Sequence, residues 1–176
     1  MRPIELKIKG INSYREEQVI NFSQLTSQGF FGIFGSTGSG KSTILDAITL
    51  ALYAKLPRGS KNFININESS ASVSFRFSIT TTETKEYLVE RSFRYPGKDR
   101  TSTARNTTAR LSLLSETDID VLADKPTDVT RSCTDLLGLS SDDFLRTVVL
   151  PQGQFSDFLK LKNQERRGML QRIFHL

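Results

Sequence analysis

A glycine-rich motif near the N-terminus constrains the fold of this chain more than any other feature. Residues 35–42 read Gly-Ser-Thr-Gly-Ser-Gly-Lys-Ser, which satisfies the pattern G-x-x-x-x-G-K-[ST] in full. Residues 29–34, just before it, are almost wholly apolar, as in a strand that is buried on both faces. After it, from about Lys41 to Tyr53, apolar side chains recur at helical spacing. A strand, a glycine-rich turn and a helix in this order predict an α/β fold of the P-loop class.

Each residue type in the motif suits the binding of a polyphosphate. Gly35, Gly38 and Gly40 let backbone N–H groups approach phosphate oxygens where a Cβ would interfere. The helix that begins near Lys41 directs its N-terminal amides and positive dipole end at the same anion. We expect Lys41 to act as a catalytic residue at the β- and γ-phosphates of ATP, and the Ser42 hydroxyl to ligate Mg²⁺. The candidate nucleotide-binding residues are Gly35, Ser36, Thr37, Gly38, Ser39, Gly40, Lys41, Ser42 and Thr43. The alternative is a glycine-rich loop of no consequence, and the predicted strand and helix on either side argue against it.

The rest of the chain is predicted to be mainly antiparallel β-structure. Strands are predicted at 4–11, 19–22, 73–79, 87–93, 111–114 and 121–122, and a second helix at 127–139. In small-molecule kinases the chain usually returns from the P-loop helix to a parallel strand. A β-meander after that helix is instead typical of the heads of ABC-type ATPases.

Composition excludes several other classes of protein. The chain is 37% hydrophobic and 24% charged, as is ordinary for a soluble globular protein. Its single cysteine, Cys133, excludes an internal disulfide framework and is predicted to be a small packing residue in a reducing compartment. The longest apolar stretch, residues 47–54, is too short to span a bilayer. We therefore expect a cytoplasmic protein without a membrane segment.

The net charge of +5 permits a polyanionic partner without requiring one. Residues 96–110 are predicted to form an exposed loop with four basic residues among hydroxyl side chains, namely Lys98, Arg100, Arg105 and Arg110. A contact with the DNA backbone and a solvated loop without a partner are equal alternatives for this segment.

Two segments resemble the SbcC family of DNA-repair ATPases. Residues 35–48 resemble that family's Walker A stretch, and residues 142–155 resemble the approach to its Q-loop. Residues 6–14 and 19–22 match its opening strands, so the resemblance covers nearly the whole chain. It implies a P-loop NTPase of ABC/SMC type, with the N-terminal lobe of the head and its accessory antiparallel meander in residues 1–160. Residues 161–176 would then begin a coiled-coil helix.

The resemblance also assigns a role to Gln152. In ABC-type heads the Q-loop glutamine contacts Mg²⁺ and the attacking water, so Gln152 is a candidate catalytic and metal-binding residue, ahead of Gln154. Some relatives carry an arginine at the position of Asn12, near the base and α-phosphate. Arg15 lies close to that position but out of register, and no role is transferred to it.

Two motifs of the complete head do not occur in this sequence. There is no apolar run that ends in an Asp-Glu pair, and 119–124 is a poor match to a Walker B motif. There is also no Leu-Ser-Gly-Gly signature. In the SbcC family both lie in a C-terminal half beyond a coiled coil. Because nothing here is a convincing general base, we expect the isolated chain to bind Mg-ATP weakly and to hydrolyse it slowly or not at all.

The resemblance implies a nucleoid-associated ATPase that clamps double-stranded DNA and controls a nuclease in double-strand break and hairpin processing. Its partners would be the C-terminal half of the same protein, a second head in a homodimer and an SbcD-like nuclease subunit. A structural clamp of the SMC, RecF or RecN type, without a nuclease, is the first alternative. A small-molecule kinase is the second, and it would need a lid with catalytic arginines, for which no convincing pattern is present.

Overall fold

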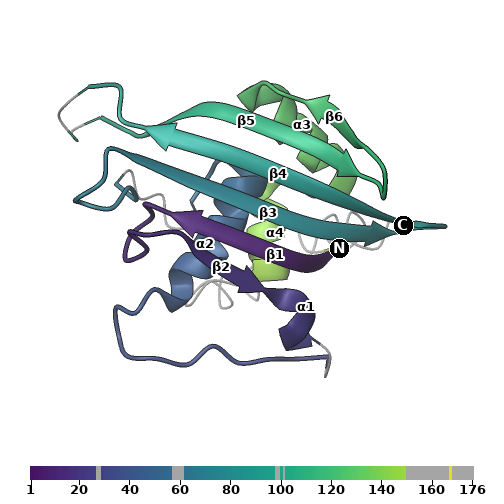
Figure 1. Ribbon diagram of the computed structural model, residues 1–176, viewed down its shortest axis with the longest axis horizontal. Helices are drawn as coiled ribbons and strands as arrows, with labels where there is room; N and C mark the ends of the chain where they lie inside the picture. The colour runs from purple at the N-terminus through teal and green to yellow at the C-terminus, as the bar shows by residue number, and fades with distance from the viewer. Residues whose placement is uncertain (27–28, 57–61, 98–99, 101, 150–166, 168–176) are drawn as a thin grey trace.

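Alternation of inward apolar and outward polar side chains builds one curved antiparallel sheet (Figure 1). The computed structural model describes residues 1–26, 29–56, 62–97, 100, 102–149 and 167. The six strands lie in the order β2-β1-β3-β4-β5-β6, and every neighbouring pair is antiparallel. The strands are β1 Arg2–Lys9, β2 Gln18–Asn21, β3 Ser70–Thr80, β4 Thr84–Arg94, β5 Arg105–Leu114 and β6 Ile119–Ala123.

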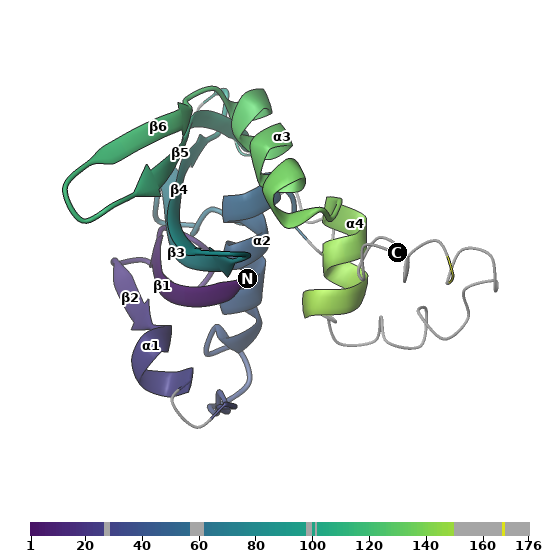
Figure 2. The ribbon, with the colours of Figure 1, turned by 90° about the vertical axis from the view of Figure 1, so that its right-hand side faces the viewer.

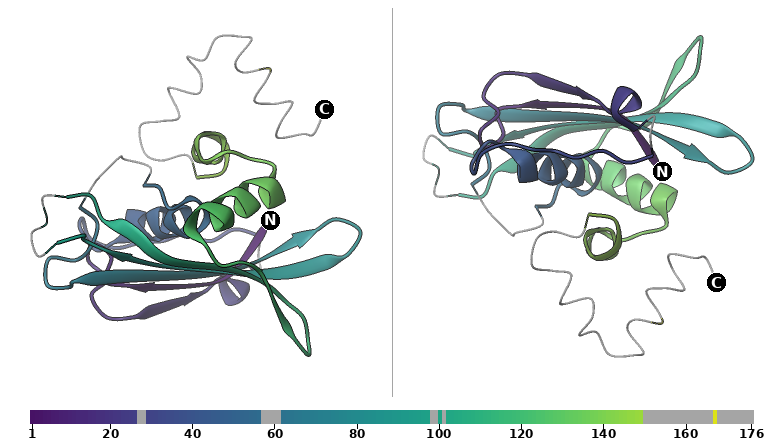
Figure 3. Two further views of the ribbon diagram at one scale, coloured as in Figure 1. Left: turned by 90° about the horizontal axis from the view of Figure 1, so that it is seen from above. Right: turned by 90° about the horizontal axis from the view of Figure 1, so that it is seen from below.

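The described residues form four α-helices, of which the last three lie on one side of this sheet and the first follows the edge strand β2 (Figure 2). They are α1 Phe22–Leu25, α2 Lys41–Tyr53, α3 Pro126–Leu137 and α4 Ser141–Phe144, which runs into the π-helical turn η2 Leu145–Val149. Both α2 and α3 pack directly on the sheet, and α4 lies beyond them (Figure 3). Tyr53 joins α2 to this outer segment, because its hydroxyl donates to Leu139 O at 3.0 Å and its ring lies 5.4 Å from that of Phe144. No helix in the described ranges is long and apolar enough to cross a membrane.

The hydrophobic core lies between the sheet and the two inner helices. From the strands it receives Leu6, Ile8, Val73, Phe75, Phe77, Val89 and Phe93, and from the helices Ala47, Leu50, Ala51, Val129 and Cys133. Cys133 has no exposed surface, and burial raises the pKa of its thiol to about 11. The prediction that it is a packing residue is therefore confirmed.

One arginine is fully inside this core. Arg91 of β4 is 2% exposed and donates to Ala51 O at 2.6 Å and to Leu52 O at 3.1 Å, at the C-terminal end of α2. It also donates to Thr130 Oγ1 at 3.0 Å in α3. Burial lowers the pKa of the Arg91 guanidinium. The carbonyl groups at the C-terminal end of α2 carry a partial negative charge, which stabilises the positive charge of the guanidinium.

Most elements that the sequence pattern predicts are present, including the helix from Lys41 to Tyr53. The prediction for residues 29–34 was wrong, because this segment belongs to no strand, and Phe30 and Phe34 are 82% and 93% exposed. Continuous apolarity indicates burial, but a strand also needs neighbouring strands for its backbone groups. No strand in the described part of the chain pairs with residues 29–34.

The predicted exposed loop at 96–110 was also partly wrong. Residues 105–110 belong to β5, where they pair with β4 from Arg94 to Glu90. Most of their side chains are polar and point to solvent, so the apolar alternation that marks a strand is absent from the sequence there. Backbone pairing with β4 decides the structure of this segment.

Candidate functional site

The predicted phosphate loop, residues 35–40, leads directly into α2 at Lys41. The Lys41 ammonium lies across the loop and donates to Gly35 O and Ser36 O, each at 2.7 Å. A turn inside the loop is closed by Ser39 N donating to Ser36 O at 3.2 Å. Lys41 is therefore already held at the loop by backbone carbonyls, and phosphate oxygens could replace these carbonyls as acceptors of its hydrogen bonds.

The N-terminus of α2 suits an anion. No side chain caps its first turn, which also contains no acidic residue, and its N-cap position is Gly40. Because the first amides of a helix have no intrahelical acceptor, a phosphate at this point would satisfy them. Ser42 is exposed in the same turn, where its hydroxyl could ligate Mg²⁺. Residues 35–42, which we predicted for the phosphates of ATP and for Mg²⁺, therefore lie together at the start of α2, and their roles stay predictions.

A turn from the opening of the chain packs against this loop. Residues 10–15, here called the N-terminal turn, connect β1 to β2 and are closed by hydrogen bonds between Ile11 and Tyr14. A Cβ at Gly40 would lie 2.5 Å from Ser13 Oγ and 2.7 Å from the Tyr14 ring. Gly40 also has φ +93°, so both its conformation and its neighbours require glycine. Sequence spacing provided no signal for this contact, because the two segments lie far apart in the chain.

The N-terminal turn also contacts the residue that follows Ser42. Asn12, in the left-handed conformation with φ 48°, donates from Nδ2 to Thr43 Oγ1 at 3.3 Å. Thr43 is 6% exposed, and it was predicted as a nucleotide-binding residue. Asn12 thus lies beside the predicted site.

Other residues singled out from the sequence lie elsewhere. Arg15 pairs with Glu68, at 2.9 Å from its Nε to the carboxylate oxygen. Gln152 and Gln154 lie outside the described residues, as does most of the segment predicted to begin a coiled coil. Residues 119–123, part of the poor Walker B match, form the exposed edge strand β6.

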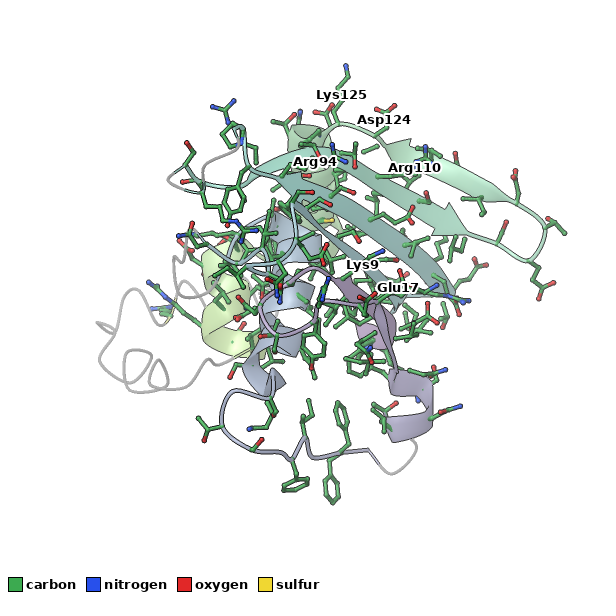
Figure 4. The ribbon with its side chains drawn as sticks, turned by 60° about the vertical axis from the view of Figure 1, so that its left-hand side comes forward. Lys9, Glu17, Arg94, Arg110, Asp124 and Lys125 are labelled. Atoms are coloured by element: carbon green, nitrogen blue, oxygen red, sulfur yellow. The ribbon has the colours of Figure 1, made fainter. Side chains whose placement is uncertain are left out.

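A groove lies on the face of the sheet that is turned away from α2 and α3. Its floor is rich in hydroxyl groups, including Ser72, Ser74, Ser92 and Thr108. Its charged residues include Lys7, Lys9, Arg110, Glu17, Glu90 and Asp124, of which Figure 4 labels Lys9, Glu17, Arg110 and Asp124. Because acidic and basic side chains are balanced, this groove does not on its own favour a polyanion.

Comparison with known proteins agrees with the motifs. A family model described as an AAA domain matches residues 5–175. The SbcC component of the nuclease SbcCD of Clostridium acetobutylicum is 52% identical over 176 residues, which is 100% of this chain and 15% of that protein. The corresponding SbcC component of Bacillus subtilis is 51% identical and again matches 100% of this chain, which corresponds to 16% of its own length. A probable DNA double-strand break repair Rad50 ATPase of Aquifex aeolicus is 34% identical over 97% of this chain and 16% of its own length.

The chain therefore spans about 15% of the length of the curated relatives that it matches. A solved structure from work on ATP-driven dimerization and DNA-stimulated activation of SMC ATPases has a TM-score of 0.60 at 22% identity. The matched region covers 98% of this chain and 99% of the chain in that structure. The predicted SbcC resemblance and the P-loop fold of ABC/SMC type are confirmed.

Proposed function

We propose that this chain, which belongs to the AAA domain family, is the ATP-binding lobe of an SbcC-like ATPase. The observation that carries the proposal is the loop at the N-terminus of α2, with Lys41 held across it. Lys41 and the backbone amides of residues 35–43 bind the phosphates, and Ser42 ligates Mg²⁺, which neutralises charge on the transferred phosphoryl group. Gln152 positions the attacking water, as the SbcC resemblance implies.

The lobe is completed by the C-terminal half of the same protein. The apolar segment 29–34 supports this, because its phenylalanine side chains at 30 and 34 are almost fully exposed and its backbone has no partner strand within the described residues. A strand from the C-terminal half would pair with this segment and cover it. That half also supplies the residue that activates water, so the lobe alone binds Mg-ATP weakly and turns it over slowly or not at all.

The complete protein clamps double-stranded DNA as a dimer of heads and controls an SbcD-like nuclease that processes breaks and hairpins. The names of the relatives support the nuclease, and the exposed Arg105 and Arg110 of β5 are the candidate contacts with the DNA backbone. A structural clamp without a nuclease is the alternative, and copurification of a nuclease with the full-length protein separates the two.

The test is ATP turnover and gel-filtration size of the chain, alone and mixed with its C-terminal half. We expect turnover and dimerisation only in the mixture, and the loss of turnover in Lys41→Ala. Full turnover by the isolated chain would instead indicate a self-contained P-loop enzyme. Equal turnover by the Lys41→Ala mixture would exclude the proposed site.

A further inference from the structure

A loop between α2 and β3 holds the N-terminal turn in place. This bridging loop, residues 62–69, accepts a hydrogen bond from Asn12 N to Phe63 O at 2.7 Å. Asn65 binds the turn twice, from its backbone N to Gly10 O at 2.8 Å and from Nδ2 to Asn12 O at 2.6 Å. Both the backbone and the side chain of Asn12 are therefore fixed, the first by the bridging loop and the second by Thr43.

Arg100 holds the bridging loop from its other side. Its guanidinium donates to Asn65 O at 2.9 Å, to Ile64 O at 3.5 Å and to Glu68 O. It also lies over the Tyr95 ring, 5.6 Å from the centroid. A planar fork of N–H donors can serve several carbonyls at once, which the single ammonium of a lysine does less well.

These contacts form a continuous path from Arg100 to the phosphate loop. The path runs through the bridging loop at Asn65, through Asn12 of the N-terminal turn, and ends at Thr43 in the first turn of α2. If a binding loop is already ordered before the ligand arrives, less conformational entropy is lost on binding and the affinity is higher. Loss of a contact early in the path would leave Asn12 and the turn against Gly40 less ordered.

We propose that Arg100 is a positioning residue for the nucleotide site, acting through Asn65 and Asn12, and that it is not a DNA contact. The proposal rests on the proposed function of the phosphate loop. It separates Arg100 from Arg105 and Arg110, which came from the same basic stretch of the sequence but are exposed on β5. The guanidinium of Arg100 is part-buried and its donors already serve backbone carbonyls.

The first experiment measures binding of a fluorescent ATP analogue with Mg²⁺ to the full chain. Arg100→Ala should weaken affinity about fivefold, the cost of about one hydrogen bond, with an unchanged number of sites. Partial unfolding would lower the number of sites and leave Kd the same, and that result would overturn the proposal. Arg131→Ala is the matched control, since its guanidinium pairs with Asp128 on the surface of α3. It should bind like the unmodified chain.

A double-mutant cycle tests the path itself. Asn65→Ala keeps the backbone oxygen that accepts from Arg100 but removes the bond from Nδ2 to Asn12. If both residues act along one path, the double variant should bind about as weakly as either single variant. If the double variant instead bound about 25-fold more weakly than the unmodified chain, the two losses of affinity would be independent. That result would overturn the proposal.

DNA binding gives a second, independent measurement. It asks whether Arg100 itself contacts a phosphate of DNA. The salt dependence of binding to a double-stranded oligonucleotide should be the same for Arg100→Ala and the unmodified chain. A reduction of the slope by about one would make Arg100 a phosphate contact and refute the proposal. Failure of the proposed function looks different, because Lys41→Ala would then bind the nucleotide as well as the unmodified chain does.

Discussion

Single residues at and near the phosphate loop are constrained by conformation and by neighbours, and the two constraints can be separated. Gly40 and Gly29 both have positive φ, +93° and +84°, but only Gly40 has neighbours that a Cβ would strike. At Gly29 no heavy atom of the described residues lies within 4 Å of the added carbon. The pair therefore distinguishes backbone strain from steric displacement of the N-terminal turn.

We expect Gly40→Ala to lower the free energy of unfolding by at least about 2 kcal/mol and Gly29→Ala by about 1 kcal/mol. Only Gly40→Ala should also weaken binding of Mg-ATP, by about tenfold or more, because Ser13 and Tyr14 must move. Urea denaturation and nucleotide titration of the two variants provide the measurement. Equal effects of both substitutions on nucleotide affinity would show that the N-terminal turn does not support the site.

At the scale of elements, Arg91 joins its own strand β4 to α2 and α3 through hydrogen bonds to carbonyl and hydroxyl oxygens of these two helices. Its donors satisfy the last carbonyls of α2 and the Thr130 hydroxyl of α3, and its backbone lies in β4. The position of α2, and therefore of the phosphate loop at its other end, depends on this contact. A buried arginine that binds carbonyl groups is stabilising because its removal would leave those groups without partners.

We expect Arg91→Met to lower the free energy of unfolding by about 3 kcal/mol or more, since methionine fills space but donates nothing. The control is Arg76→Met on β3, whose ion pair with Glu86 is partly exposed and should contribute about 1 kcal/mol or less. Urea denaturation of both variants measures the difference. Similar losses at the two sites would mean that Arg91 is only a packing residue.

At the scale of the molecule, the chain exposes an apolar segment that its own sheet does not cover. Phe30 and Phe34 are the most exposed large apolar side chains of the described residues. The six-stranded sheet and α2 form without them, and the phosphate loop follows them directly in the chain (Figure 1). This arrangement is what we expect of a lobe that is completed by another half.

The paired substitution Phe30→Ser and Phe34→Ser should weaken association with the C-terminal half about 100-fold or more. Burial of each phenylalanine is worth about 1.5–3 kcal/mol, and about 1.4 kcal/mol corresponds to a factor of ten in Kd. Ile119→Ser, at the opposite edge of the sheet on β6 and 62% exposed, is the control and should associate normally. Analytical ultracentrifugation or calorimetry would measure the affinities, and unchanged affinity of the paired variant would place the C-terminal half elsewhere.

The sequence by itself determined the helix from Lys41 to Tyr53 with the glycine-rich segment before it, the paired strands β3 and β4 and the resemblance to SbcC. These features depend on local spacing, and local spacing is what a sequence displays directly. It could not determine whether residues 29–34 find neighbouring strands, or that 105–110 pair with β4, because backbone pairing depends on segments that are distant in the chain. Only the tertiary structure brought Asn12 to Thr43, Ser13 to Gly40 and Arg100 to the bridging loop. Each of these contacts joins residues more than twenty positions apart, at distances that only the packing of sheet, turn and helix decides.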